Sequence, residues 1–488
     1  MKKTTTRKAA TTVRRSSLID ATLMGTARTA NGAPTNPTSM DACVDLFFLA
    51  GASRAMKERE IISIFSKAYG EDPLTAMKIL FWARDVRGGA GERHIFQVVT
   101  KWLEANHSDV LYKNVKYIPE FGRWKDIFDF NSDVIIPLIK KGLKDEHASG
   151  LLAKWLPRKG DLANAVRKAL RLTPKGYRKL VVGLSNTVEQ KMCAKEYGAI
   201  KYEAVPSVAM NKYRKAFYKN DDARFKMFID AVTKGEKKIN AGALFPYDLL
   251  VALREGGNEK AIQAQWNALT NYLEGSTENF LVMADVSGSM GSFNYYGGKN
   301  NSTTKVRPID ISVSLAIYLS ERSRGIFKDA FLTFTSTPTM QYLKGELADR
   351  VRQLKGPVGY DTNIQAAFTT ILSKAKANRV PVTDMPSKIL IISDMEFNCS
   401  EIRKPNGTTM DMIIEEYKRA GYKCPEIIFW NVNGREENVP AKCDMKNVGL
   451  VSGFSPSIIT SILSGKVVTP RDLMIKAVYS DRYEKITI

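Results

Sequence analysis

Oxygen-bearing side chains recur at alternate positions in the sequence LVMADVSGSM, which contains Asp285, Ser287 and Ser289. The apolar run before them, residues 280–284, predicts a buried strand that ends at the aspartate. Open α/β sheets bind ligands at the carboxyl ends of their strands. Carboxylate and hydroxyl oxygens, without thiolate or imidazole, suit Mg²⁺ or Mn²⁺. The spacing therefore predicts a divalent-cation site at the edge of a sheet.

Two further candidate ligands follow downstream. Thr362, in GYDTNIQAAF, precedes a segment whose apolar residues recur at helical spacing. Asp394 ends the apolar run 388–393, so we expect it at the carboxyl end of another strand. The predicted cation ligands are Asp285, Ser287, Ser289, Thr362 and Asp394.

This order of motifs resembles the metal-ion-dependent adhesion site of von Willebrand factor A (vWA) domains. The resemblance implies a Rossmann-like, doubly wound α/β domain over residues 277–488. It also implies a role for the bound Mg²⁺ or Mn²⁺, which either accepts an acidic group from a protein partner or holds the surrounding loops in place.

Other interpretations of the motif remain open. Asp285 and Ser287 could cap a turn, although this leaves Asp394 unexplained. A phosphatase of the haloacid-dehalogenase type needs a second aspartate where Ser287 stands. A two-metal nuclease needs more carboxylates than this motif offers. We therefore predict a protein without enzymatic activity, and a Mg²⁺-dependent nuclease or phosphatase is the weaker alternative.

The surrounding sequence predicts the elements that would position these ligands. Further strands are expected at 330–334, 426–430 and 448–451, and helices after Pro308, near Glu346 and after Asp411. This alternation predicts a mostly parallel sheet with helices on both faces. An antiparallel edge strand is expected at 339–343. The segment 294–305, rich in Gly, Asn, Ser and Tyr, predicts either a flap beside the ion or an ordinary surface loop.

The net charge of +22 is concentrated in two parts of the chain. Residues 1–35 carry seven Lys and Arg against one Asp, a net charge of +6. Residues 151–240 carry 21 Lys and Arg against eight Asp and Glu, a net charge of +13, and the remaining 363 residues carry only +3. Such local excess is typical of a surface that binds nucleic acid.

Before the α/β half, the pattern is helical. Residues 1–38 lack periodicity and are predicted to form a disordered basic tail, with an organellar transit peptide as the alternative. Residues 39–256 show helical spacing without strand alternation, and Asp72 followed by Pro73 predicts a helix start. Residues 257–276 are predicted to be a linker or a helix.

Candidate RNA contacts come from two stretches. Arginines flank the glycine-rich turn at 88–91, which follows a helix and lacks the Gly-Lys-Ser/Thr of a P-loop. Residues 177–219 interleave Lys and Arg with Tyr and Phe, which suits RNA phosphates and stacked bases; alternatively, the aromatic rings face the core. The candidates are Arg84, Arg87, Arg93, Arg178, Lys179, Lys212, Arg214, Lys215 and Lys219.

Several helical segments, among them FWARDVRGGAGERHIF, EFGRWKDIFDF and LLAKWLPRKG, precede the vWA-like motif. This combination resembles the Ro autoantigen (TROVE-type) architecture, and more closely a related uncharacterised viral, bacterial and plant family. The resemblance implies HEAT-like helical repeats that bind small noncoding or misfolded RNA. The alternative is a vWA interaction or assembly factor, either a partner of chaperones or AAA+ ATPases or a virion-associated protein, without specific RNA binding.

Composition narrows the class of protein. No apolar run approaches the length of about 18 residues that suggests a membrane span. The five cysteines are far apart and form no C-x-x-C pair, so the sequence suggests neither a disulfide framework nor a zinc site. These features predict a cytoplasmic protein in a reducing compartment.

Overall fold

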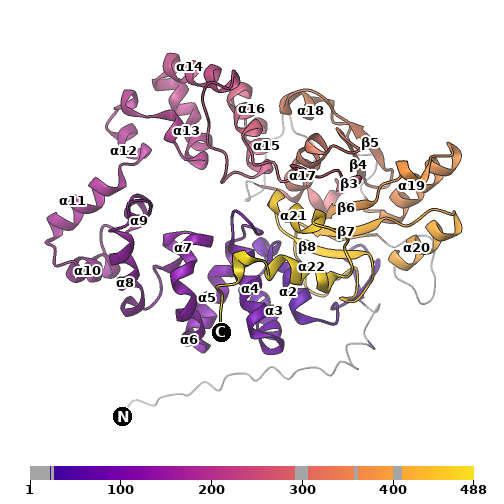
Figure 1. Ribbon diagram of the computed structural model, residues 1–488, viewed down its shortest axis with the longest axis horizontal. Helices are drawn as coiled ribbons and strands as arrows, with labels where there is room; N and C mark the ends of the chain where they lie inside the picture. Colours follow the sequence, from indigo (N-terminus) through magenta and orange to yellow (C-terminus); the bar gives the residue numbers. More distant parts are fainter. Residues whose placement is uncertain (1–21, 23–26, 292–305, 357–360, 399–408) are drawn as a thin grey trace, which may run out of the picture.

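The computed structural model describes residues 22, 27–291, 306–356, 361–398 and 409–488. Within these residues a helical region is followed by a mixed α/β domain (Figure 1). None of the described helices combines the length and the apolar character needed to cross a membrane.

The helical region extends from α2 to α16 and consists of short helices that pack on their neighbours in sequence. Helix α4 (Pro73–Arg84) begins where the sequence predicts, because the Asp72 side chain accepts a hydrogen bond from the amide of Thr75 and Pro73 occupies the first turn. The helices are α2 (Ala42–Ala50), α3 (Glu58–Glu71), α4 (Pro73–Arg84), α5 (His94–Asn106), α6 (Ser108–Asn114), α7 (Ile118–Phe121), α8 (Ser132–Gly142), α9 (Ser149–Trp155), α10 (Asp161–Ala169), α11 (Pro174–Ser185), α12 (Val188–Cys193), α13 (Ser207–Asn220), α14 (Asp222–Thr233), α15 (Pro246–Arg254) and α16 (Glu259–Asn267).

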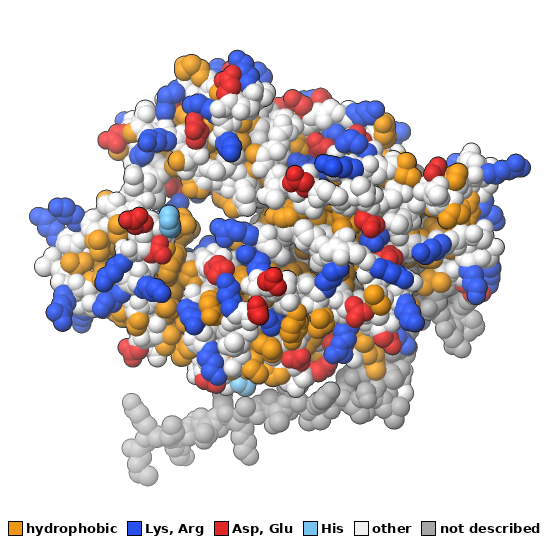
Figure 2. Space-filling model, in the orientation of Figure 1, with side chains coloured by type: hydrophobic (Ala, Val, Ile, Leu, Met, Phe, Trp, Pro, Cys, Tyr) orange, Lys and Arg blue, Asp and Glu red, His pale blue; other side chains and the backbone are white. Residues whose placement is uncertain are grey.

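These helices curve until the loop after α4 meets the segment before α15. Gly91 packs so closely on Phe245 that an added Cβ would lie 2.6 Å from the ring. The Tyr272 hydroxyl donates a hydrogen bond to the carbonyl of Arg87 at 3.4 Å. We call the arc α5–α14, closed by this contact, the helical ring. Figure 2 shows a hollow in the corresponding part of the surface, with Lys and Arg side chains along its border.

The α/β domain contains a six-stranded sheet in the order β5-β4-β3-β6-β7-β8. All strand pairs are parallel except β4 and β5, so the antiparallel edge strand expected at 339–343 is confirmed. The strands are β3 (Phe280–Asp285), β4 (Ala330–Phe334), β5 (Thr339–Tyr342), β6 (Lys388–Ser393), β7 (Glu426–Asn431) and β8 (Val448–Ser452). Strands β3 and β6 are buried along their whole length, as expected for central parallel strands covered on both faces.

Helices alternate with these strands. Helix α17 lies against β3, β4 and β6, where the Ser312 hydroxyl donates to the Ile392 carbonyl at 3.2 Å. The expected helices after Pro308, near Glu346 and after Asp411 correspond to α17, α18 and α20, the last beginning slightly earlier than predicted. The helices are α17 (Pro308–Arg322), α18 (Leu347–Gln353), α19 (Ile364–Ala377), α20 (Thr409–Arg419), α21 (Ile459–Leu463) and α22 (Pro470–Val478).

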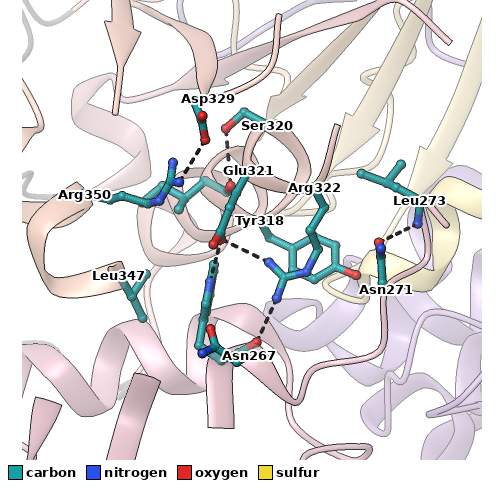
Figure 3. A network of polar contacts seen from close by, with 12 residues as sticks. Asn267, Asn271, Leu273, Tyr318, Ser320, Glu321, Arg322, Asp329, Leu347 and Arg350 are labelled. Carbon is teal, nitrogen blue, oxygen red and sulfur yellow. Dashed lines mark hydrogen bonds and ion pairs between the residues drawn. The ribbon is translucent and has the colours of Figure 1, made fainter. Parts of the chain in front are cut away.

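The helical region packs on the α/β domain at both of its ends. At one end, α2 and α4 lie against β8 and α22. At the other end, α15 and α16 lie against α17 and α18, so α16, in the predicted linker or helix 257–276, belongs to the joint. In this second joint Arg322 donates to the carbonyl of Trp266 at 2.8 Å and lies over the Tyr318 ring, while Arg350 pairs with Asp329 at 2.8 Å (Figure 3).

The predicted disordered tail is wrong for residues 27–38. This stretch forms a short antiparallel hairpin, β1 (Ala27–Arg28) and β2 (Pro34–Thr35), in which Ala33 and Asn36 are almost fully buried. Its polar residues lack periodicity because they bond to loops far away in the sequence instead of forming a regular element. The rest of the predicted tail, residues 1–21 and 23–26, and the predicted flap 294–305 lie outside the described residues.

Candidate metal centre and basic surface

The sheet brings the two candidate aspartates to one edge. Strands β3 and β6 are parallel neighbours in which Ala284 is paired with Ile392, so Asp285 and Asp394 lie at the same carboxyl end. Asp285 is fully buried, and Asp394 is 2% exposed. Thr362 lies two residues before α19, next to Asn363, which caps the first turn of that helix. The edge of the sheet therefore gathers side chains from three separate segments of the chain.

The hydroxyl groups complete an oxygen-lined site. The Ser287 amide donates to the Asp285 carboxylate at 2.9 Å, and the hydroxyls of Ser287 and Ser289 lie 3.2 Å apart. The Ser289 hydroxyl also lies near the Asp394 carboxylate and lowers its pKa, against the effect of burial. The hydroxyl of Thr362 is buried and has no hydrogen-bond partner within the described structure. A buried hydroxyl without a hydrogen-bond partner is unfavourable. The oxygen of the Thr362 side chain is therefore available to a ligand.

The electrostatics of the edge favour a cation. Burial, with a further contribution from neighbouring Asp394, raises the pKa of Asp285 to about 7. Burial also raises the pKa of Asp394. Two buried carboxylates this close need either a proton or a positive charge between them, and a divalent cation reverses such shifts by stabilising both ionised forms. Two carboxylates and three hydroxyls, without sulfur or imidazole, fit Mg²⁺ or Mn²⁺.

The site has few acidic groups. Across the described ranges of the chain, no group of three or more His, Cys, Asp or Glu side chains is arranged to hold a metal ion. The candidate site depends on hydroxyl oxygens for the remaining contacts. Such a donor set suits a single hydrated cation, which usually keeps several waters.

Two residues that support the site were missed from the sequence. The Ser393 hydroxyl donates to Asp285 at 2.5 Å, from the residue next to Asp394. Asn398 accepts a hydrogen bond from the Thr362 amide at 2.8 Å and donates its own amide to the Thr362 carbonyl at 2.9 Å. A serine within the apolar run 388–393 is a local signal that could have identified Ser393. No local pattern marks Asn398, since its partner is 36 positions away.

Two of the nine predicted RNA-binding residues are not accessible to RNA. Arg84 is 2% exposed and donates two hydrogen bonds to Asp126, at 2.6 and 2.8 Å. Arg214 is 6% exposed and donates to the Asn211 carbonyl at 2.7 Å. Both guanidinium groups bind acceptors inside the protein, so their predicted role in RNA contact is corrected. The other seven side chains are exposed: Arg87, Arg93, Arg178, Lys179, Lys212, Lys215 and Lys219.

Most positive charges in residues 151–240 lack a carboxylate partner. Every residue of this segment is described, and only Lys154, Arg224, Lys226 and Lys237 form ion pairs there. The segment crosses α9–α14, the half of the helical ring that follows α8. Its charge therefore stays available to an anion.

The aromatic rings of residues 177–219 lie in, or pack against, hydrophobic cores. Tyr202 and Phe217 are almost fully buried in a second hydrophobic core, together with Phe225 and Phe228. Tyr213 and Tyr218 pack against this core and are partly buried. The interpretation that these rings stack on RNA bases is therefore not supported, and the alternative, that they belong to the core, holds.

Comparison with known proteins gives two family matches. A family model described as "Domain of unknown function (DUF2828)" matches residues 29–154 and 157–278, and one described as "Domain of unknown function (DUF7788)" matches residues 279–485. The boundary between the two falls at the start of β3.

Two individual proteins resemble the chain over most of its length. "Uncharacterized protein L728" of Acanthamoeba polyphaga mimivirus is 24% identical over 512 residues, which cover 92% of this chain and 86% of the viral protein. The crystal structure of the Ro (RSR) protein of Deinococcus radiodurans superposes with a TM-score of 0.39 and 12% identity, covering 91% of this chain and all of that one.

Proposed function

The chain belongs to the DUF2828 family, whose description assigns no activity, and from this starting point we propose that it is a non-catalytic RNA-binding scaffold. In this proposal the exposed cations of the helical ring bind RNA phosphates. The α/β domain is of the vWA type and holds Mg²⁺ or Mn²⁺ for contact with a protein partner.

The observation that carries the RNA proposal is the unpaired charge of residues 151–240. Lys212, Lys215 and Lys219 recur at helical spacing on α13 and are all exposed. Among the residues that the structure describes, Lys215 has only the carbonyl of Glu255 at hydrogen-bond distance, 3.4 Å away. Lysines in such a row can follow a phosphate backbone, and the counterions released make binding salt-dependent. With aromatic rings in the core, we expect recognition of backbone and shape more than of base identity.

Charge reversal on α13 tests this proposal. The triple change Lys212→Glu, Lys215→Glu and Lys219→Glu should weaken binding to all RNA sequences, and each lost phosphate contact should lower the slope of log K against log salt by about 0.7. A matched control reverses three exposed lysines of the α/β domain: Lys374, Lys376 and Lys446. If fluorescence anisotropy gives the α13 variant the same affinity for RNA as wild type, α13 is not part of the RNA-binding surface.

A second function, metal-dependent contact with a protein, is favoured by the unsatisfied hydroxyl of Thr362 and the pair of buried carboxylates. Asp285→Ala should abolish Mn²⁺ binding and Mg²⁺-dependent recovery of a partner while leaving RNA affinity unchanged. Loss of RNA binding together with metal binding would instead assign the ion a role in folding.

The absence of catalysis is testable in the same preparations. Purified protein should leave RNA intact over hours in Mg²⁺. Time-dependent cleavage that requires Mg²⁺ and disappears in Asp394→Ala would establish the nuclease alternative and contradict the scaffold proposal.

A further inference from the structure

The N-terminal hairpin is bonded to the loop that follows Asp394. The Thr29 hydroxyl donates to the Phe397 carbonyl at 2.5 Å, and the Asn31 side chain donates to the Glu396 carbonyl at 2.6 Å. The amide of Ala30 donates to the Glu396 carboxylate. Residues 365 to 368 positions apart in sequence are thus joined by three hydrogen bonds. These contacts fix the backbone immediately beyond a candidate metal ligand.

The same loop also contacts Thr362, through Asn398. Gly32 in the hairpin forms an antiparallel bridge with Asn398. Asn398 in turn holds the backbone of Thr362 by two hydrogen bonds, one through its side chain and one through its own amide. The hairpin therefore contacts the residue that sets the position of the unsatisfied Thr362 hydroxyl.

A second anchor holds the loop from its other side. The Thr35 hydroxyl donates to the Asn438 side chain at 3.0 Å, and Asn438 donates to the Met395 carbonyl at 3.0 Å. Asn36 forms an antiparallel bridge with Val439. Met395 itself has a φ of +65°, a conformation that a non-glycine residue adopts only when its surroundings impose it. The segment between Asp394 and Asn398 is thus held by hydrogen bonds in a backbone conformation that it would not adopt without them.

We propose that the hairpin, residues 27–36, is a positioning element of the cation site. It holds Thr362 in place through Asn398, and it holds Asp394 in place through the loop that runs from Asp394 to Asn398. The inference rests on the proposed cation site. Because coupling between two binding events is reciprocal, cation binding must stabilise the docked hairpin by the same factor by which the docked hairpin tightens cation binding.

The first test measures Mn²⁺ affinity of the full-length protein by electron paramagnetic resonance. Residues that orient metal ligands typically contribute 10- to 100-fold to metal affinity, so Asn31→Ala and Thr29→Val should each weaken Mn²⁺ binding about tenfold. Thr29→Ser keeps the hydroxyl and should restore wild-type affinity. Asn131→Ala is the matched control, since it removes an asparagine that caps α8 in the helical region, and its Mn²⁺ affinity should equal that of wild type.

The second test uses amide hydrogen exchange in the hairpin. The amides of Ala30 and Asn36 donate to Glu396 and Val439, and their exchange should slow when Mn²⁺ is added. Wild-type Mn²⁺ affinity in both hairpin variants, with exchange indifferent to Mn²⁺, would overturn the positioning role and leave the cation site intact. If wild type binds no Mn²⁺, the site itself is overturned along with the inference.

Discussion

Thr362 presents an unusual side chain, a threonine hydroxyl that is buried without a partner in the part of the chain covered by the structure. Such a group destabilises a fold by about 1–3 kcal/mol, so its retention is consistent with a ligand that satisfies it. Around it the site consists of two aspartates that repel each other and two serines that bridge to them. In the proposed site, a bound cation stabilises both ionised carboxylates and gives the Thr362 hydroxyl a partner.

The prediction at this residue is that Thr362→Val stabilises the metal-free protein by about 1 kcal/mol or more, because valine has the same shape and removes the unpaired hydroxyl. Mn²⁺ at 100 times its Kd should stabilise wild type by about 2.7 kcal/mol, and the variant clearly less. Thr100→Val is the control, since Thr100 is equally buried but donates to the Phe96 carbonyl at 2.7 Å. An equal Mn²⁺ shift in all three proteins, measured by chemical denaturation, would contradict a role for Thr362.

Arg84 gives a prediction about stability instead of binding. Its guanidinium pairs with Asp126, whose side chain is fully buried, so Arg84→Met should leave an under-compensated charge and destabilise the protein by about 3 kcal/mol. Arg123 also pairs with Asp126, at 2.8 Å, and limits the loss. Arg87→Met removes an exposed arginine from the loop that follows α4 and should change stability by less than about 0.5 kcal/mol. If urea denaturation gives Arg84→Met the same free energy of unfolding as wild type, the ion pair does not stabilise the fold.

Residue types and spacing sufficed to predict that the five candidate cation ligands meet at one edge of the sheet, because each lies at the end of a strand or near the start of a helix that has its own local pattern. That they bind a cation stays a prediction. Burial of Arg84 and Arg214 could not be predicted, since nothing in a helical sequence distinguishes an arginine that meets a carboxylate 42 positions away from one that meets solvent. The same limit applies to Asn398, whose contacts lie outside its own segment.

At the scale of elements, the parallel pairing of β3 and β6 is what makes a site from distant segments. Their apolar runs predicted both strands within about a residue, as they did β4, β7 and β8. The hairpin at residues 27–36 escaped prediction because its strands have two residues each, too few to show alternation. Its stability comes from hydrogen bonds to other loops, which the sequence of the stretch does not display.

The joint between α2 and β8 supplies a prediction at this scale. The Gly51 amide donates to the Ser452 hydroxyl at 2.9 Å, and a Cβ at position 51 would lie 2.3 Å from the Ser452 carbonyl oxygen. Gly51→Ala should therefore separate the helix from the sheet and destabilise the protein by about 3 kcal/mol, the upper range for overpacking.

Gly70→Ala is the matched control for this joint. Gly70 lies inside α3 with open space around it, so alanine there should stabilise the protein by about 0.5–1 kcal/mol. A Gly51→Ala protein as stable as the Gly70→Ala protein, by thermal unfolding, would mean that α2 does not dock on β8 as described.

At the scale of the molecule, a helical region rests on an α/β domain at both ends and curves into a ring between them (Figure 1). Alternating strands and helices predicted the α/β domain, and helical periodicity predicted the rest. Closure of the ring could not be predicted, because it depends on contacts such as that of Gly91 with Phe245, which no local pattern encodes. Closure places the charge of α9–α14 on a curved surface around a hollow (Figure 2).

The most direct test of the scaffold proposal is the affinity of the full-length protein for a structured RNA with a single-stranded 3′ end, titrated across salt concentration. We expect log K to fall by about 0.7 to 0.9 per phosphate contact against log salt, with several contacts and a clear preference over duplex DNA. Weak binding that does not distinguish RNA from DNA would contradict the account, and the basic half of the helical ring would then be a solvated surface.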